Sequence, residues 1–306
     1  MDSTRRVKKV LRSVPTIEGA GVHLKRAFGY HQLPELDPFL LLDDFGSSDP
    51  ADYLKGFPWH PHRGIETITY LLRGTVEHGD SLGNEGIITA GDVQWMTAGS
   101  GIIHQEMPLG GEDGVMRGTQ LWANLPATHK MMTPRYRDIT GDQIPVVELE
   151  QGMKIRVIAG VVNGTRGPVQ DIIIDPQYLD ITLPAGKKFS HPVEAGYTVF
   201  CYILSGSGCF EPAGSPPSDR SAAPASIDDT AEDLVDSGCL VIFADGNQVE
   251  ISAADAGIRL LLISGKPLGE PVAWRGPIVM NTQAELRIAF EEFQNGTFIK
   301  HQTTGR

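Results

Sequence analysis

The stretch Phe57–Gly74 restricts the fold more than any other segment, because it combines strand-forming residues with three potential metal ligands. Side chains two residues apart on a β-strand point to the same face. His60, His62 and Glu66 are separated by even numbers of residues, so one continuous strand would present all three together. We therefore expect one face of a single strand to be able to hold a metal ion.

A second stretch, Gly91–Pro108, carries His104 and Glu106, which are again two residues apart and face together on a strand. Three imidazoles with a carboxylate suit iron, manganese, nickel, copper or zinc better than calcium, and no cysteine lies nearby in sequence. Four ligands leave about two of six octahedral positions open for a small molecule or dioxygen. A structural zinc site, or no metal, is the alternative, but structural zinc sites usually contain cysteine. The spacing leaves both Glu66 and Glu106 open as the carboxylate ligand.

The composition indicates a turn-rich globular protein, because 35 of the 306 residues are Gly, 21 are Pro and 41% are hydrophobic. The formal charge of -12 opposes direct contact with nucleic acid or anionic lipid. No apolar run approaches the roughly 20 residues of a membrane span. Three cysteines are too few for a disulfide framework and favour a reducing compartment. We expect a cytoplasmic protein, or a nuclear one in a eukaryotic host.

Several runs of β-branched and aromatic residues bounded by Gly, Asp or Asn predict strands of a sandwich or barrel. Three of them are Thr67–Leu72, Thr198–Leu204 and Leu240–Ala244. Helical periodicity is clear only near the end of the chain, behind the capping box Thr282–Glu285 and before Gly296. Its apolar positions are Leu286, Phe290 and Phe293. We expect an all-β protein with one short C-terminal helix that covers a barrel face.

The two halves of the chain resemble each other, since Tyr70–Glu77 is similar to Tyr202–Cys209. Two barrels of one type follow. With the repeats aligned on their glycines, Pro192, Glu194 and Thr198 occupy the positions of the first half's ligands. The second barrel therefore cannot bind a metal in the same way.

The domain boundary is expected in the charged, turn-forming segment Thr133–Ile144. We divide the chain into an N-terminal barrel, residues 1–137, and a C-terminal barrel, residues 138–306. The Pro-, Ala-, Ser- and Asp-rich stretch 212–236 is expected to be a mobile loop inside the second barrel.

Three long motifs together resemble the pirin family of the cupin superfamily: His60–Thr67, Gly91–Met107 and Gly276–Thr282. The resemblance runs along nearly the whole chain. It implies two tandem jelly-roll-type cupin barrels with a metal, most simply Fe2+, only in the N-terminal one. The ligands that it implies are His60, His62, His104 and Glu106.

The resemblance thus favours Glu106 over Glu66 as the carboxylate ligand. Glu66 would then accept a hydrogen bond from a ligand histidine or meet Arg63, as residues around metal ligands commonly do. The apolar residues that flank the ligands would form the substrate pocket, with ordinary barrel core as the alternative. They are Phe57, Trp59, Trp95, Met96 and Met107.

Pirins are linked to quercetin 2,3-dioxygenase activity, so the resemblance implies an enzyme that cleaves a flavonol with O2 and releases carbon monoxide. Glu106 would serve as metal ligand and as proton acceptor. An alternative of another class is a non-catalytic metal or redox sensor that binds a transcription factor or a metabolic enzyme. A third possibility is the same barrel acting on a different substrate, because one fold can support many different sites.

Overall fold

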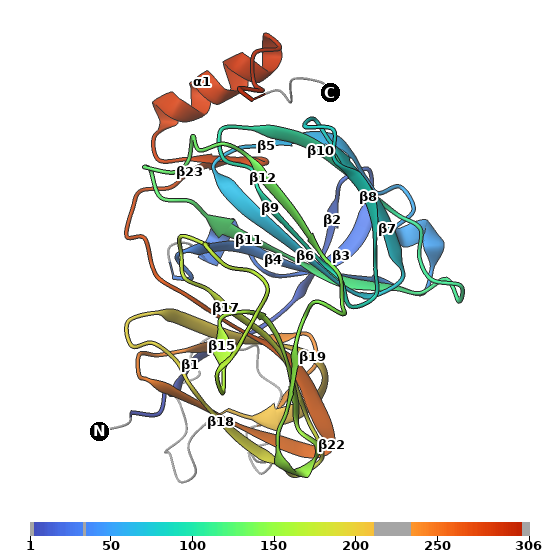
Figure 1. Cartoon of the computed structure of the whole chain (residues 1–306), viewed down its shortest axis with the longest axis vertical. Coiled ribbons are helices and arrows are strands. Elements are labelled where there is room, and N and C mark those ends of the chain that lie inside the picture. The colour runs from blue at the N-terminus through green and yellow to red at the C-terminus, as the bar shows by residue number, and fades with distance from the viewer. Residues whose placement is uncertain (1–2, 33–34, 211–233, 302–306) are drawn as a thin grey trace. The chain divides into compact units, whose positions relative to one another are not determined.

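The chain forms two compact units, each built mainly of strands, in the computed structural model, which describes residues 3–32, 35–210 and 234–301 (Figure 1). We call one unit the N-terminal barrel; it consists of Pro15–Gln143 and Leu268–Arg306. The other, the C-terminal barrel, consists of Met1–Val14 and Ile144–Pro267. The all-β prediction is confirmed. Within the described ranges, no helix has the length and apolar character needed to cross a bilayer.

The two units are not the sequential halves 1–137 and 138–306 that the sequence suggested. The first 14 residues belong with the C-terminal barrel, and the last segment, from Leu268, belongs with the N-terminal barrel. The reason is long-range pairing, because β1 (Val7–Arg12) pairs with β21 (Cys239–Phe243). Most of the loop predicted at 212–236 lies outside the described residues, and Val235–Asp236 forms the short strand β20.

The N-terminal barrel contains a four-stranded sheet, β5-β10-β7-β8, and a seven-stranded sheet, β12-β9-β6-β11-β4-β3-β2. The strands are β2 (Val14–Glu18), β3 (Val22–Phe28), β4 (Phe39–Ser47), β5 (Phe57–His62), β6 (Ile65–Arg73), β7 (Thr75–Asp80), β8 (Glu85–Thr89), β9 (Val93–Thr97), β10 (Ile102–Pro108), β11 (Met116–Asn124) and β12 (Arg135–Ile139). Two 3-10 turns, Tyr30–Gln32 and Pro50–Asp52, connect them. The chain changes sheets between β5 and β6, at Arg63 and Gly64.

The C-terminal segment completes the N-terminal barrel with the hairpin β23 (Ala273–Arg275) and β24 (Ile278–Met280), followed by α1 (Gln283–Gln294), which is red in Figure 1. The predicted capping box is confirmed. Leu286 and Ala289 form the buried side of α1, whereas Phe293 is 40% exposed. The predicted helix therefore covers the N-terminal barrel, the unit that contains β5 and β10.

The C-terminal barrel is built on a nine-stranded sheet in which β18 and β20 pair beside the main order β1-β21-β19-β22-β17-β14-β13. Its remaining strands are β13 (Val146–Glu148), β14 (Lys154–Ala159), β15 (Val161–Val162), β16 (Thr165–Arg166), β17 (Gln177–Leu183), β18 (Lys188–Pro192), β19 (Thr198–Cys209) and β22 (Gln248–Gly265). A 3-10 turn, Glu150–Gly152, precedes β14. One continuous apolar core fills this unit, and it includes Val199, Cys201 and Leu262.

Candidate metal centre

Three histidines meet inside the N-terminal barrel because β5 and β10 pair antiparallel, with His104 opposite His60 and Ile102 opposite His62. One ring nitrogen of each histidine lies within 4.8 Å of those of the other two. His62 and His104 are buried, whereas His60 is half-buried. This group could hold a metal ion.

Backbone carbonyls fix the protonation of two of the rings. His60 Nδ1 lies 2.9 Å from the Pro58 carbonyl oxygen, and His62 Nδ1 lies 3.2 Å from that of Pro277. A carbonyl oxygen only accepts, so each Nδ1 carries a proton, and in the neutral form of either ring the Nε2 then carries a lone pair. These two Nε2 atoms lie 3.0 Å apart. Two lone pairs at this separation repel each other unless a cation lies between or beside them.

The third imidazole shows the same need for a cation. Both ring nitrogens of His104 are buried without a hydrogen-bond partner, and such a group is costly to bury. Burial, together with the neighbouring imidazoles, lowers the pKa of His62 and His104 well below the usual value of 6.5. Both rings are therefore neutral at physiological pH, which is the form that binds metals. The donor set thus fits a first-row metal ion.

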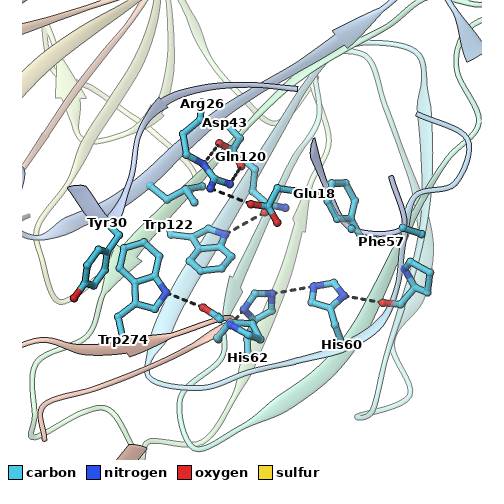
Figure 2. Close-up of a pocket in the computed structure, with 16 residues that line it drawn as sticks. Glu18, Arg26, Tyr30, Asp43, Phe57, His60, His62, Gln120, Trp122 and Trp274 are labelled. Atoms are coloured by element: carbon cyan, nitrogen blue, oxygen red, sulfur yellow. Dashed lines mark hydrogen bonds and ion pairs between the residues drawn. The ribbon is translucent and has the colours of Figure 1, made fainter. Parts of the chain in front are cut away.

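A cavity of about 750 Å³ opens on this centre and is lined by His60 and His62. In Figure 2 these two rings lie on one side of the cavity, Arg26 and Asp43 lie on the opposite side, and Trp122 lies between. The remaining walls are largely aromatic. Four aromatic side chains contribute to them: Tyr30, Phe57, Trp122 and Trp274. The size and aromatic walls are those of a site for an organic molecule.

Comparisons with known proteins identify the family. The family model "Pirin" matches residues 21–123, and the model "Pirin C-terminal cupin domain" matches residues 178–299. This chain belongs to the pirin family. It is 42% identical to a pirin-like protein of Caulobacter vibrioides over 96% of this chain and 99% of that one. It is 36% identical to human pirin over 96% and 94% of the two chains.

A solved structure of quercetin 2,3-dioxygenase from Acinetobacter baumannii is also similar, with a TM-score of 0.83 and 31% identity. The match covers 97% of this chain and 99% of that one. The prediction of two tandem cupin barrels with a short C-terminal helix is confirmed.

Glu106, the carboxylate that the pirin resemblance favours as a ligand, lies outside the group of three histidines. Its Oε1 accepts a hydrogen bond from Thr69 Oγ1 at 2.9 Å, and its Oε2 accepts one from Gln120 Nε2 at 2.9 Å. Gln120 Oε1 in turn accepts from the Trp122 indole at 3.1 Å, which fixes the amide. The pairing of β10 with β5 shifts register between His104 and Glu106, and such a bulge re-aims side chains.

Glu66 does not share a strand with the histidines, so the expectation of three ligands on one strand was wrong. It lies on β6 in the other sheet, because the chain turns at Gly64, where φ is +78°. Its carboxylate accepts a hydrogen bond from Thr97 Oγ1 at 2.6 Å and lies 4.0 Å from Arg135. Burial raises the pKa of Glu66, against the opposing effect of these partners.

Arg63 likewise has other partners than Glu66. Its Nη1 lies 2.7 Å from Glu292 Oε2, its Nη2 donates to the Phe298 carbonyl oxygen at 2.8 Å, and the guanidinium stacks on the Phe298 ring. Among the contacts described for these residues, the expected Glu66–Arg63 pair does not occur. Arg63, which follows His62 in the sequence, instead binds the C-terminal segment through Glu292 and Phe298.

Of the residues expected in the pocket wall, only Phe57 lines this cavity. Trp59 is 55% exposed, and Trp95 and Met96 belong to the buried interior. Met107, which is half-buried, also lies outside the cavity lining. Gln120 and Trp122 are two residues apart on β11, so their side chains point to the same face. This spacing is visible in the sequence and could have identified two residues of the cavity wall.

The side of the cavity away from the histidines is charged. Arg26 makes two hydrogen bonds of 2.8 Å to Asp43 and an ion pair of 3.0 Å with Glu18. Burial raises the pKa of Asp43, against the opposing hydrogen bonds from Arg26. Two carboxylates facing one guanidinium leave this wall net negative when all three are ionised, so it favours hydrogen-bond donors over anionic groups.

Proposed function

We propose that this chain is a metal-dependent dioxygenase of the pirin type that cleaves a flavonol such as quercetin. The observation that carries the proposal is the convergence of three imidazoles, with facing Nε2 atoms on His60 and His62, beside an aromatic-walled cavity. The quercetin dioxygenase named among its structural relatives supports the choice of substrate. The reaction would insert both atoms of O2 into the flavonol and release one carbon atom as carbon monoxide.

The metal would be held by His60, His62 and His104, with Glu106 as the fourth ligand, and we propose Fe2+ for this role. Such an ion supplies a Lewis acid for the flavonol hydroxyl and a redox couple for dioxygen chemistry. The Pro58 and Pro277 carbonyls hold the histidine rings with Nε2 directed inward. This second layer of hydrogen bonds keeps the ligands oriented before the metal binds.

Glu106 has a second role in the proposal, as the acceptor of the proton from the flavonol hydroxyl. In the structure, Gln120 lines the cavity and binds the Glu106 carboxylate. Glu106 must therefore give up its hydrogen bonds to Gln120 and Thr69 before it reaches the histidines or the substrate. Replacing Glu106 with Gln should retain some metal but lower turnover sharply, and unchanged turnover in a metal-replete variant would rule out this role.

The planar flavonol would lie against Trp122 and Trp274, whose ring centroids are 6.0 Å apart. Its peripheral hydroxyls would donate to Glu18 and Asp43 on the charged side of the cavity. Aromatic stacking and a few polar contacts are the usual means by which a largely apolar pocket orients a small molecule.

The test is oxygen uptake together with carbon monoxide release from quercetin, using protein loaded anaerobically with Fe2+. His104→Ala should abolish both signals, because it removes a ligand. His191→Ala is a matched control, since His191 is also a buried histidine but lies in the C-terminal barrel, hydrogen-bonded to Gln177. No uptake by a protein shown to hold iron would overturn the proposal and favour the metal or redox sensor, or another substrate.

A further inference from the structure

A second, much smaller cavity of about 30 Å³ lies in the N-terminal barrel next to Glu106. Neither His60 nor His62, which line the large cavity, borders it. Most of its wall is apolar and belongs to the core between the two sheets. The apolar wall residues are Val22, Leu24, Phe45, Phe57, Val76 and Pro108.

The polar side chains on this wall already have hydrogen-bond partners. Thr69 Oγ1 donates to Glu106 Oε1, and Gln120 Nε2 donates to Glu106 Oε2. Asp43 accepts two hydrogen bonds from Arg26. The wall thus has few hydrogen-bonding groups left to offer a guest.

Tyr53, the last polar member of the wall, donates its hydroxyl to the Gly114 carbonyl oxygen at 2.8 Å. Among the residues described around this cavity, no buried side-chain nitrogen or oxygen is without a partner. A buried water typically needs two to four polar partners, whereas apolar cavities stay dry and accept xenon or small apolar molecules. The cavity is therefore better suited to an apolar guest than to water.

Its volume sets the size of that guest. A buried water molecule needs a cavity volume of about 10–15 Å³, so a diatomic molecule fits and an aromatic ring does not. Asp43, Phe57 and Gln120 border both cavities and thus form a common wall between them. The small cavity has the size and lining for a gas, and it lies beside a carboxylate of the candidate site.

We propose that the small cavity is a binding site for dioxygen, separate from the cavity that takes the organic substrate. Its use in turnover rests on the proposed dioxygenase function, but its capacity to bind a small apolar gas does not. In this arrangement dioxygen would approach Glu106 from the Val76 side, and the flavonol would approach from the Trp122 side of Gln120. The two substrates would not compete for space.

A direct test uses dissolved O2 as a paramagnetic probe of methyl groups in the full chain loaded with Zn2+, an ion without redox chemistry. Under oxygen pressure, the methyl groups of Val22, Leu24 and Val76 should relax severalfold faster than those of Val199 and Leu262. The latter two are also buried, but they belong to the apolar core of the C-terminal barrel. Equal relaxation in the two sets would overturn the proposal.

Filling the cavity tests its role in turnover. Val76→Phe should abolish the excess relaxation at Val22 and Leu24 and raise the KM for O2 severalfold, with an unchanged KM for quercetin. Val76→Ile is the milder variant if Val76→Phe fails to fold, and Val199→Ile is the matched control in the other barrel.

The outcomes separate the two proposals. Suppose that the wild type shows the excess relaxation, and that an active variant with the cavity filled keeps the KM for O2 of the wild type. This result would overturn the proposal that the enzyme takes its oxygen from this cavity. If the iron-loaded wild type consumes no oxygen with quercetin, the proposed function fails. The relaxation of the zinc-loaded protein then decides by itself whether the cavity binds gas.

Discussion

The Nε2 atoms of His60 and His62 face each other at 3.0 Å, while the Nδ1 atom of each ring is held by a backbone carbonyl. A divalent ion relieves the repulsion between the two lone pairs, so its binding should stabilise the N-terminal barrel. A ligand present at 100 times its Kd adds about 2.7 kcal/mol to the free energy of unfolding. We therefore expect Fe2+ or Zn2+ to raise the unfolding temperature and a chelator to lower it again.

Tryptophan fluorescence can follow this effect in one barrel alone, because all four tryptophans lie in the N-terminal barrel. His62→Ala should remove the metal-dependent shift. His191→Ala should leave that shift intact, although it loses a partly buried hydrogen bond in the other barrel. A chelator-sensitive shift that survives in His62→Ala would show that the metal binds elsewhere.

Trp274 and Trp59 provide a matched test of the cavity wall. Trp274 lines the cavity and packs edge-on against Tyr30 at 5.7 Å, whereas Trp59 is 55% exposed and lies outside the lining. Losing an aromatic contact costs about 0.5–1.5 kcal/mol beyond the buried area. Trp274→Ala should therefore raise the KM for quercetin by about tenfold, and Trp59→Ala should leave it unchanged. Equal effects of the two substitutions would contradict this assignment of the wall.

Arg63 should be energetically coupled to Glu292 and not to Glu66. A double-mutant cycle with Arg63→Met and Glu292→Gln should give a coupling free energy of about 1–3 kcal/mol, because the two side chains form an ion pair of 2.7 Å. The parallel cycle with Glu66→Gln should give a value close to zero. Urea denaturation followed by tryptophan fluorescence measures both. A larger coupling in the second cycle would restore the pairing expected from the sequence.

The parts of the fold that were predictable are those that depend on local patterns. The capping box at Thr282 and Glu285 satisfies backbone groups three residues away, so it is visible in sequence. The spacing of His60 and His62 places both on one face of β5. The pairing of His104 with His60 joins two motifs about forty residues apart and was not visible in the sequence.

The features of the fold and the site that were not predicted depend on contacts between segments that are distant in sequence. Gly64 lies at the turn between β5 and β6, which separates Glu66 from the histidines. The C-terminal segment restricts this position to glycine, because a Cβ atom there would lie 1.9 Å from the Val279 carbonyl oxygen. Pro277 and Trp274 of that segment also contribute to the site. No periodicity within one strand can reveal such contacts. It also cannot reveal that the first 14 residues belong to the C-terminal barrel and the last segment to the N-terminal barrel.

Lys130 should give the N-terminal barrel a distinct pH dependence. Its Nζ is buried and donates to the Gly64 and Val279 carbonyl oxygens and to Asn124 Oδ1. Burial lowers the pKa of Lys130 from 10.5 to about 7. Between these two values the unfolded chain binds more protons than the folded chain, so stability should rise with pH, by up to about 1.4 kcal/mol per pH unit.

Lys130→Met removes this proton exchange, so the measurement is the difference in unfolding free energy between wild type and variant at pH 7, 8 and 9. The wild type should gain stability relative to Lys130→Met as the pH increases, even if the variant is less stable throughout because three carbonyl-type acceptors lose their donor. Lys25→Met, at an exposed lysine on β3 of the same barrel, is the control and should run parallel to wild type. A constant difference between wild type and Lys130→Met would mean that Lys130 keeps an ordinary pKa and is charged when buried, held by its three acceptors.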